Sequence, residues 1–407
     1  MAERKRICVM GLGYIGLPTA SLLATKGYQV HGVDVREDVV DTINAGHIHI
    51  TEPELDVLVR SAVQSGRLKA AMEPAPADVF ILAVPTPFKD DHVPDLSYVE
   101  AAARAIGPHL APGNLVILES TSPVGAAERL AEWVFDERPD LQQGGLFIAH
   151  CPERVLPGQI IKELIANDRI VGGIDEPSTD VAADFYREFV TGEVLTTRSR
   201  TAELAKLAEN TFRDVNIALA NELSLICDHL NVDVWELIKL ANHHPRVNIL
   251  QPGPGVGGHC IAVDPWFVVH SAPEQSRLVR TAREVNSAKP AHVIEKVKAR
   301  AARIHEPTIA CFGLAYKPDI DDLRESPALE ITQALAAQRV GRILVVDPHT
   351  DQLPRNLFEA GVRLMGTEAA LAEADVLVGL VAHRAFRRMP SAALQEKVVI
   401  DACGVWR

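Results

Sequence analysis

The fold is decided by residues 6–18, Arg-Ile-Cys-Val-Met-Gly-Leu-Gly-Tyr-Ile-Gly-Leu-Pro. An apolar run ends at Met10, glycines follow at 11, 13 and 16, and residues 19–26 can form a helix. Glycines at this spacing permit a tight turn and let backbone N–H groups approach a pyrophosphate. Residues 30–34 are the next apolar run. The pattern therefore predicts a β-α-β unit whose turn binds a dinucleotide.

Asp34 indicates which dinucleotide to expect. It ends the second predicted strand, 18 residues after Gly16, where a carboxylate can bond the hydroxyls of the adenosine ribose. The carboxylate would repel a 2′-phosphate, so we expect NAD rather than NADP, although nearby Arg36 argues in the other direction. A glycine turn with a purely structural role is the alternative, and the strand-turn-helix context favours the cofactor.

A second α/β pattern begins after Pro307. Residues 78–84 and 114–119 continue the first pattern as apolar runs typical of buried parallel strands. Residues 201–230 contain neither Gly nor Pro and predict a helix of about eight turns. Residues 308–312 and 343–347 then repeat the strand pattern, but the turn at Gly313 lacks the other glycines. We predict two similar α/β domains around a helical segment, the second binding something other than a dinucleotide.

Composition narrows the class of protein. The chain has 407 residues, 47% of them hydrophobic, which is enough for two or three cores, and a net charge of -13 that argues against sequence-independent nucleic-acid binding. Its six cysteines show no CxxC spacing, so we expect no metal site and no disulfides, and a cytoplasmic location. No apolar run is long enough for a membrane span.

The segment 253–260, Gly-Pro-Gly-Val-Gly-Gly-His-Cys, is too rich in Gly and Pro for a helix or strand. It places Cys260 on a loop with little side-chain cover, which suits a nucleophile. The alternative is a small buried thiol, the commoner state of a free cysteine. Reactive cysteines need accessible, electropositive surroundings, and a cation could come from the long helix.

That helix carries a polar stripe at helical spacing, formed by Lys206, Asn210, Arg213, Ile217 and Asn221. A solvated face would explain it. Asn is a poor choice for an exposed helix interior, however, and the flanking residues are apolar. Periodicity alone leaves both interpretations open.

Taken together, six motifs resemble those of the UDP-glucose/GDP-mannose dehydrogenase family. They are GLGYIGLP (11–18), ESTSPVG (119–125), CPER (151–154), KLAEN (206–210), GGHCIAVDP (257–265) and GLAYKP (313–318). The match runs in order along essentially the whole chain.

The resemblance implies two Rossmann-like domains with parallel sheets, at 1–195 and 301–407. The first would bind NAD and the second a UDP-sugar, while a central long-helix segment, 196–300, would carry catalysis and dimerisation. It implies oxidation of a UDP-sugar at C6 with two NAD per substrate, without nucleic acid or membrane. His259, Val263 and residues 243–255 resemble the branch that converts UDP-N-acetyl-D-mannosamine to its uronate for surface polysaccharides. UDP-N-acetylglucosamine and UDP-glucose stay open as substrates.

Catalytic roles follow from the same resemblance. Cys260 would carry the thiohemiacetal and thioester intermediates. Lys206, with Asn210 and the Asp264 carboxylate through a water, would accept the first proton and stabilise the oxyanion. Glu153 would be the base for thioester hydrolysis, and Thr121 would orient water and the nicotinamide.

Binding residues carry over in the same way. The cofactor contacts would be Gly11, Gly13, Tyr14, Ile15, Gly16, Asp34, Thr86, Thr121 and Arg324. The substrate contacts would be Arg154, Val155, Lys206, Asn210, Arg213, His244, Arg246, Gly257, Tyr316 and Lys317, with His244 and Arg246 crossing from the partner of a homodimer. One position departs from the family: Cys403 stands where a Lys or Arg is usual, which puts that substrate contact in doubt.

Two other functions compete. A two-electron dehydrogenase of the β-hydroxyacid type would share the first domain, the long helix and a catalytic lysine, but needs neither the cysteine nor the second domain. A dinucleotide-sensing regulator would explain the glycines and leave residues 253–260 and 308–407 without a purpose.

Overall fold

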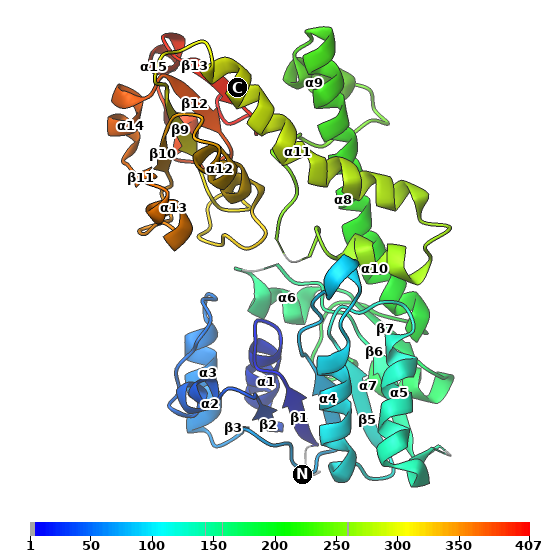
Figure 1. The fold of residues 1–407 in the computed structure, drawn as a ribbon. Coiled ribbons are helices and arrows are strands. Elements are labelled where there is room, and N and C mark those ends of the chain that lie inside the picture. Colours follow the sequence, from blue (N-terminus) through cyan, green and yellow to red (C-terminus); the bar gives the residue numbers. More distant parts are fainter. Residues whose placement is uncertain (1–4, 143, 157, 259) are drawn as a thin grey trace. The chain divides into compact units, whose positions relative to one another are not determined.

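The computed structural model describes residues 5–142, 144–156, 158–258 and 260–407. The chain divides into two compact units, 1–208 and 209–407 (Figure 1). The boundaries at 195 and 300 stay a prediction.

The first unit is built on an eight-stranded sheet of order β3-β2-β1-β4-β5-β6-β7-β8. Strand β7 pairs antiparallel with β6 and parallel with β8, and the remaining pairs are parallel. The strands predicted at 6–10, 30–34, 78–84 and 114–119 are confirmed as β1, β2, β4 and β5. The bounds are β1 Arg6–Met10, β2 Gln29–Val33, β3 Leu68–Ala71, β4 Val79–Leu82, β5 Asn114–Leu118, β6 Leu146–His150, β7 Arg169–Gly173 and β8 Val194–Arg198.

Helices cover both faces of this sheet, which explains why β1, β4 and β5 are apolar on both sides. One apolar core forms with α1 (Gly16–Thr25), α2 (Glu37–Asn44), α3 (Leu55–Gln64), α6 (Ile160–Ala166) and α7 (Glu176–Arg187). The other forms with α4 (Ser97–Ile106) and α5 (Ala126–Glu137). The α/β class predicted for this part of the chain is confirmed.

The second unit contains a five-stranded parallel sheet of order β11-β10-β9-β12-β13. Its strands are β9 (Thr308–Phe312), β10 (Arg342–Val346), β11 (Arg363–Leu364), β12 (Val376–Gly379) and β13 (Val398–Asp401). Helices α11 (Arg277–Ala301), α12 (Pro327–Ala337) and α13 (Arg355–Glu359) pack into one core. Helices α14 (Thr367–Glu373) and α15 (Ser391–Gln395) contribute to the other. A second Rossmann-like sheet is thus confirmed.

The long helix is α8, Ser199–Leu230, with 32 residues. Within the second unit, its polar stripe is only partly solvated: Asn210 and Asn221 are buried, whereas Arg213 is exposed. Asn210 bonds Asp264, while Asn221 bonds Asn286 of α11 at 2.8 Å. The neighbouring Asp214 of α8 pairs with Arg283 of α11 at 2.6 Å. The helix α9 (Val234–Ala241) follows α8, and α10 (Asp264–Ser271) follows the glycine-rich loop.

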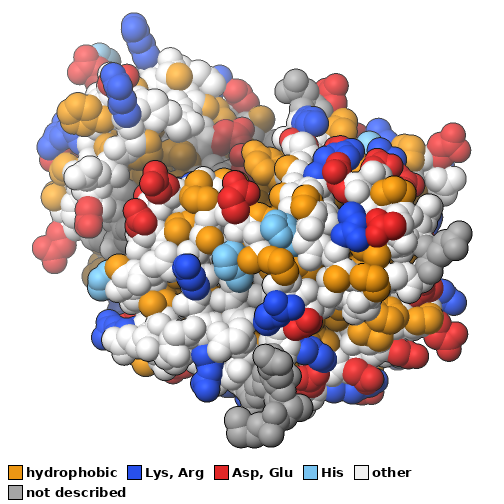
Figure 2. Space-filling view, turned by 90° about the horizontal axis from the view of Figure 1, so that it is seen from below, with side chains coloured by type: hydrophobic (Ala, Val, Ile, Leu, Met, Phe, Trp, Pro, Cys, Tyr) orange, Lys and Arg blue, Asp and Glu red, His pale blue; other side chains and the backbone are white. Residues whose placement is uncertain are grey.

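None of the helices in the described residues has the length and apolar character of a membrane-spanning helix. The face drawn in Figure 2 shows acidic side chains interspersed among basic ones. This mixture of signs agrees with the composition.

Candidate functional site

The glycine turn after β1 leaves no space for side chains at two positions. A Cβ on Gly16 would lie 1.8 Å from the carbonyl oxygen of Gly11, and one on Gly11 would lie 2.7 Å from that of Ala83. Gly11 also has a φ of +89°, which L side chains rarely adopt. Gly13 faces open space. The turn thus leaves its backbone accessible at the start of α1, beside Tyr14 and Ile15, as a pyrophosphate requires.

Asp34 lies directly after β2 and faces this turn. Its Oδ2 accepts the Leu12 N–H at 3.0 Å, and its Oδ1 accepts the Arg36 N–H at 3.0 Å. The Arg36 guanidinium pairs with Asp38 instead. Because Asp34 stays partly accessible and Arg36 already has a carboxylate partner, the geometry fits an adenosine ribose without a 2′-phosphate.

The second unit repeats this turn with a different outcome. Gly313 has a φ of +94°, and Asp347 Oδ2 accepts the Leu314 N–H at 2.7 Å. Here, however, the carboxylate is fully buried, and the Nε2 of buried His383 lies 3.5 Å from it. A ribose hydroxyl cannot reach that carboxylate. The prediction that this domain binds something other than a dinucleotide in the usual way agrees with this geometry.

His383 also belongs to a cluster with Asp319 and His349, in which one possible metal-ligand atom of each lies within 4.8 Å of the others. The His383 Nδ1 already accepts the Asp319 N–H at 2.9 Å. The Asp319 carboxylate accepts the N–H and Nε–H of Arg384, at 3.0 and 2.8 Å. These hydrogen bonds hold the turn after Lys317 in place, while the Nε2 of buried His383 has no hydrogen-bond partner among the described residues. The expected lack of a metal stays a prediction.

Cys260 is exposed at the end of its glycine-rich loop. A Cβ on Gly257 would lie 2.2 Å from the carbonyl oxygen of Glu325, and one on Gly258 would lie 2.7 Å from the Tyr316 ring. The loop therefore packs by its backbone against the segment that carries Tyr316 and Lys317, two predicted substrate residues. His259 lies outside the described residues.

The structure brings Asn210 and Asp264 together. The Asn210 Nδ2 donates to the Asp264 Oδ2 at 2.5 Å, and both side chains are buried. The carbonyl oxygen of Cys260 accepts the Asp264 N–H at 2.9 Å, which ties the cysteine to the start of α10. Half-buried Lys206 lies one turn before Asn210 on α8. A carboxylate can accept a proton, and the N–H groups of an amide or an ammonium can stabilise an oxyanion.

Glu153, the predicted base, is held by two contacts in the first unit. Its Oε1 accepts the Arg154 N–H at 2.7 Å, and its Oε2 lies 2.7 Å from Nη1 of Arg169, whose side chain is also buried. Arg154 itself donates to the carbonyl oxygen of Asp168 at 3.2 Å. Sequence reasoning missed Arg169, because nothing in its local pattern marks a strand residue whose cation is buried.

Glu119 is a second buried carboxyl beside this ion pair. The Tyr186 hydroxyl donates to its Oε1 at 2.7 Å, while Arg169 and Glu153 lie near enough to act on its charge. Burial raises the pKa of Glu119 to about 7, with the Arg169 cation opposing the shift. The motif at 119–125 contains this residue, but its burial could not be read from the sequence.

Thr86 and Thr121 also come together, since the Thr86 hydroxyl donates to the Thr121 carbonyl oxygen at 2.6 Å. The loop after Thr121 is held by Glu203, a buried residue on the α8 face that carries Lys206. Its carboxylate accepts the N–H groups of Gly125 and Ala127 at 2.6 and 2.8 Å. Glu203 was missed, although its position three residues before Lys206 was a usable signal.

The remaining predicted residues, apart from Val155, lie in exposed or partly exposed segments of the second unit. His244 and Arg246 are exposed on the loop between Asn242 and Ile249. The Asn242 side chain closes this loop: its Oδ1 accepts the Ile249 N–H at 2.7 Å, and its Nδ2 donates to the Ile249 carbonyl oxygen at 3.0 Å. Arg213 and Lys317 are exposed, half-buried Val155 lies in the first unit, and Arg324 pairs with Asp322 at 2.6 Å. Their roles in binding stay predictions.

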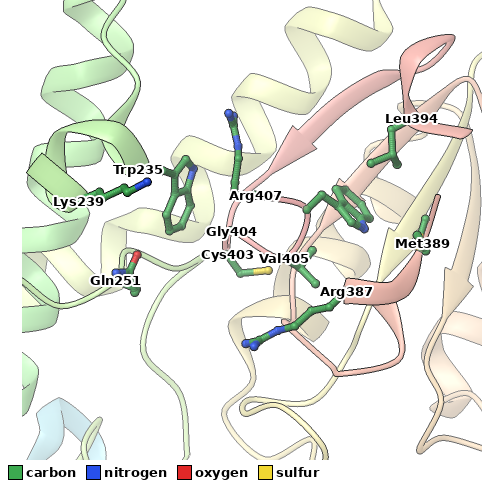
Figure 3. A pocket seen from close by; sticks show the side chains of 11 residues that line it. Trp235, Lys239, Gln251, Arg387, Met389, Leu394, Cys403, Gly404, Val405 and Arg407 are labelled. Carbon is green, nitrogen blue, oxygen red and sulfur yellow. The ribbon is translucent and has the colours of Figure 1, made fainter. Parts of the chain in front are cut away.

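A pocket of about 500 Å³ lies within the second unit. Figure 3 shows Trp235 and Lys239 of α9 on one side and residues 403–407 on the other. Its full lining is Trp235, Lys239, Gln251, Arg387, Met389, Leu394, Cys403, Gly404, Val405, Trp406 and Arg407. Three cations therefore line a cavity that also has two indole rings, a setting suited to a nucleotide.

Comparisons with known proteins decide the family. Models of the UDP-glucose/GDP-mannose dehydrogenase family match in three segments: the NAD binding domain at 5–190, the central domain at 200–288 and the UDP binding domain at 310–407. The chain belongs to this family. It is an NAD-dependent UDP-sugar dehydrogenase, and membership decides against the regulator and the β-hydroxyacid type.

Individual proteins of this family are similar to the chain over nearly its whole length. An NDP-N-acetyl-D-galactosaminuronic acid dehydrogenase from Ralstonia nicotianae is 59% identical, over 99% of this chain and 96% of that protein. A UDP-N-acetyl-D-mannosamine dehydrogenase from Escherichia coli K12 is 56% identical, over 98% and 99%. The structure of UDP-D-ManNAc dehydrogenase from Pyrococcus horikoshii superposes with a TM-score of 0.88 at 40% identity, covering 99% of this chain and 96% of that one.

Cys403 lies in the pocket, where the family resemblance leads us to expect a cation. Burial raises the pKa of this thiol, and the Asp401 carboxylate raises it further. The side chain therefore stays neutral and cannot replace a lysine or arginine. Lys239 and Arg387 are positive charges that the pocket offers instead. The third cation, Arg407, pairs with Asp233 at 2.8 Å.

Replacing Glu119 with Gln tests the buried carboxyl through the pH dependence of stability. Because its pKa rises from 4.5 to about 7 on folding, the folded state binds the extra proton, and its stability falls as pH increases through this range. Gln does not titrate. The unfolding free energy of Glu119→Gln relative to wild type should therefore rise between pH 5 and 7, by up to about 1.4 kcal/mol per pH unit.

Urea unfolding at several pH values measures this difference, with the exposed Glu176→Gln in the same sheet domain as a matched control. A difference for Glu119→Gln that is flat from pH 5 to 7 would contradict the assignment.

Proposed function

We propose that the protein oxidises C6 of UDP-N-acetyl-D-mannosamine to the carboxylate, giving UDP-N-acetyl-D-mannosaminuronate with two NAD consumed. The observation that carries this proposal is the 56% identity, over nearly the full length, to UDP-N-acetyl-D-mannosamine dehydrogenase, together with the exposed Cys260. The Ralstonia relative, at 59% identity, favours UDP-N-acetyl-D-galactosamine as a second candidate. Both candidates are UDP-linked 2-acetamido sugars. We therefore propose this class of substrate and, within it, the manno epimer.

The first half of the reaction converts the C6 alcohol to an aldehyde. NAD, when bound at the turn after β1, supplies the hydride acceptor. The hydroxyl proton must leave as the hydride does, and Lys206 with Asn210 and Asp264 would accept it, through a water in the case of the carboxylate. The short Asn210–Asp264 hydrogen bond supports this assignment, because it fixes an amide donor and a carboxylate in one buried pair.

The second half requires that the aldehyde be held. The Cys260 thiolate would add to the carbonyl carbon to form a thiohemiacetal, which can lose a second hydride and leave a thioester. Water then cleaves the C–S bond, releasing the acid and the thiol. Exposure of Cys260 and the backbone packing of its loop support this role, because an attacking group must be both accessible and fixed.

Glu153 would act as the base that activates this water, with Thr121 orienting it. Arg169 and the Arg154 N–H hold the Glu153 carboxylate in a single orientation, which supports a positioned base. NAD would be contacted by the turn glycines and by Asp34, Thr86 and Arg324.

The substrate would be bound by cations and by the loop that faces Tyr316. Arg and Lys suit a diphosphate because their N–H groups bond its oxygens with charge assistance. We assign the contacts to the sugar nucleotide as a whole to Arg154, Val155, Arg213, Gly257, Tyr316 and Lys317, with His244 and Arg246 reaching the site from a partner subunit. A cytoplasmic location is supported by NAD dependence and by free thiols at Cys8, Cys151, Cys227, Cys311 and Cys403. A role in the synthesis of surface polysaccharide precursors is what the family resemblance implies.

A homodimer is proposed from the exposed face of α8. Phe212, Leu219 and Ile226 recur every seven residues, are each at least 45% exposed, and continue to Leu230 at 61%. A regular apolar stripe on one side of a long helix is typical of a helix that packs against another helix. A second copy of the chain is the occupant that the family resemblance implies.

Assay of NADH release against UDP-N-acetyl-mannosamine, -glucosamine and -galactosamine and UDP-glucose tests the substrate. We expect the highest kcat/KM with the manno sugar and two NADH per sugar, because the product is an acid and not an aldehyde. A ratio of one would sink the four-electron reaction, while a clear preference for the galacto epimer would establish the second candidate instead.

Cys260→Ser should separate the two halves of the reaction. A serine hydroxyl near neutral pH is almost wholly protonated, so trapping fails, while alcohol oxidation needs no thiol. Oxidation of added UDP-sugar aldehyde, followed as NADH, should fall by several orders of magnitude. Cys227→Ser, which alters a buried thiol, is the control. Near wild-type aldehyde oxidation by Cys260→Ser would refute the covalent mechanism.

Leu219→Glu combined with Ile226→Glu should convert the dimer to a monomer of about half the mass, since two carboxylates would be buried at the proposed interface. Light scattering on a sizing column measures this. Leu278→Glu, at an exposed leucine on α11, is the matched control. A wild-type mass near 44 kDa would rule out the homodimer directly.

A further inference from the structure

A continuous chain of hydrogen bonds, partly buried at the loop and buried between the helices, joins the loop of Cys260 to two helices. The Gly253 N–H donates to the Asn221 Oδ1 on α8 at 2.9 Å. The Asn221 Nδ2 donates to the Asn286 Oδ1 on α11 at 2.8 Å. The Asn286 Nδ2 in turn donates to the Asp214 Oδ1 at 2.8 Å, and Arg283 anchors that carboxylate at 2.6 Å. The chain therefore runs from the loop backbone to an ion pair.

The direction of this chain is fixed by its two ends. Gly253 N–H can only donate, and Asp214 Oδ1, which also accepts the Nη1–H of Arg283 at 2.6 Å, is the acceptor at the other end. Each asparagine between them must turn its oxygen toward the loop and its nitrogen toward the carboxylate. If either amide were flipped, a donor would face a donor or an acceptor would face an acceptor, and those hydrogen bonds would be lost. Asn221 is thus held in one orientation, with its oxygen aimed at the loop.

Burial makes each of these bonds costly to lose. Asn221 and Asp214 are 0% exposed, Asn286 is 1% and Arg283 is 4%. A buried amide left without its partner loses the hydrogen bonds it made with water and gains nothing in return. The polar residues on this face of α8 therefore need a specific partner, and the loop backbone is that partner for Asn221.

The loop has few other means of being held. Residues 253–258 include four glycines and one proline, so they contribute little side-chain packing and have high entropy when unfolded. Gly255 packs against Pro290 and Pro327, and Gly258 against Tyr316. These contacts define one side of the loop. The bond from Gly253 to Asn221 attaches its beginning to α8, the helix that also carries Asn210.

We propose that Asn221 is a positioning residue that fixes the Cys260 loop for thiolate attack. This inference rests on the proposed role of Cys260. Asn221 bonds the Gly253 backbone at the beginning of the loop, and it acts by fixing where that part of the loop lies against α8. Asn210 bonds Asp264, and the Asp264 N–H bonds the carbonyl oxygen of Cys260. Both ends of the loop are therefore attached to α8, the beginning through Asn221 and the end through Asn210.

The direct test is hydrogen exchange at the Gly253 amide. Asn221→Ala removes the acceptor, and exchange of the peptide containing Gly253 should accelerate at least about 10-fold. Asn221→Asp keeps an oxygen for the Gly253 N–H, so the amide should remain protected although a buried charge lowers stability. The control is Ser224→Ala, which removes a buried hydroxyl bonded to the Asn221 carbonyl oxygen and to Lys289 without touching the loop.

Steady-state kinetics supply the functional arm. We expect kcat to fall at least about 10-fold in Asn221→Ala, because small displacements of a reacting group are costly, while KM for NAD stays within about twofold. In Asn221→Asp, kcat should be largely retained. If Asn221 had only a structural role, the loss of kcat would instead scale with the loss of thermal stability in all three variants, Asn221→Ala, Asn221→Asp and Ser224→Ala.

Should Asn221→Asp fail to fold, Asn286→Ala replaces it, since that change leaves the Gly253 bond intact. Unchanged exchange at Gly253 in Asn221→Ala would overturn the tether, and faster exchange with unchanged kcat would overturn the positioning role. The two proposals can fail separately. If Cys260→Ser still oxidises the aldehyde, but Gly253 exchange is faster in Asn221→Ala, the covalent mechanism fails and the tether between Asn221 and Gly253 stands.

Discussion

Both sheets of this protein depend on one local constraint, a glycine with positive φ directly after the first strand of each α/β pattern. At Gly11 and Gly313 the chain turns back, and the N–H of the following leucine bonds an aspartate at the end of the neighbouring strand. The glycine N–H bonds the carbonyl oxygen before that aspartate, at 2.8 Å in both cases. The same turn therefore occurs in both units, and in each it is held by the glycine backbone and by an aspartate carboxylate.

What surrounds the corner decides its function. In the first unit, α1 starts within a few residues of the turn, and Asp34 stays partly accessible, so a ribose can reach it. In the second unit, α12 starts only at Pro327 and His383 covers Asp347. The residues between Gly313 and Pro327 instead form the segment of Tyr316 and Lys317, which packs on the cysteine loop. One duplicated turn thus supports a cofactor site in one unit and a loop scaffold in the other.

Sequence patterns predicted the parts of the fold that are apolar on both faces. Strands β1, β4, β5 and β9 are continuous apolar runs because helices cover both sides. Strand β8 lies at the sheet edge with exposed positions, and β7 ends in two glycines, so neither showed a readable period. Glu203, Arg169 and His383 were missed for another reason: each is a polar residue buried by distant segments, and only tertiary structure shows its partner.

The polar stripe on α8 shows where periodicity stops being informative. Spacing placed Asn210 and Asn221 on one face, but a solvated face and a functional one predict the same spacing. The partners distinguish them: Asn210 meets Asp264, and Asn221 meets the Gly253 backbone. A loop made of glycine cannot be held by apolar packing of its own side chains, so its backbone groups must be bonded from outside. Buried asparagines suit this task because one amide both accepts from the loop and donates to the next residue in the chain.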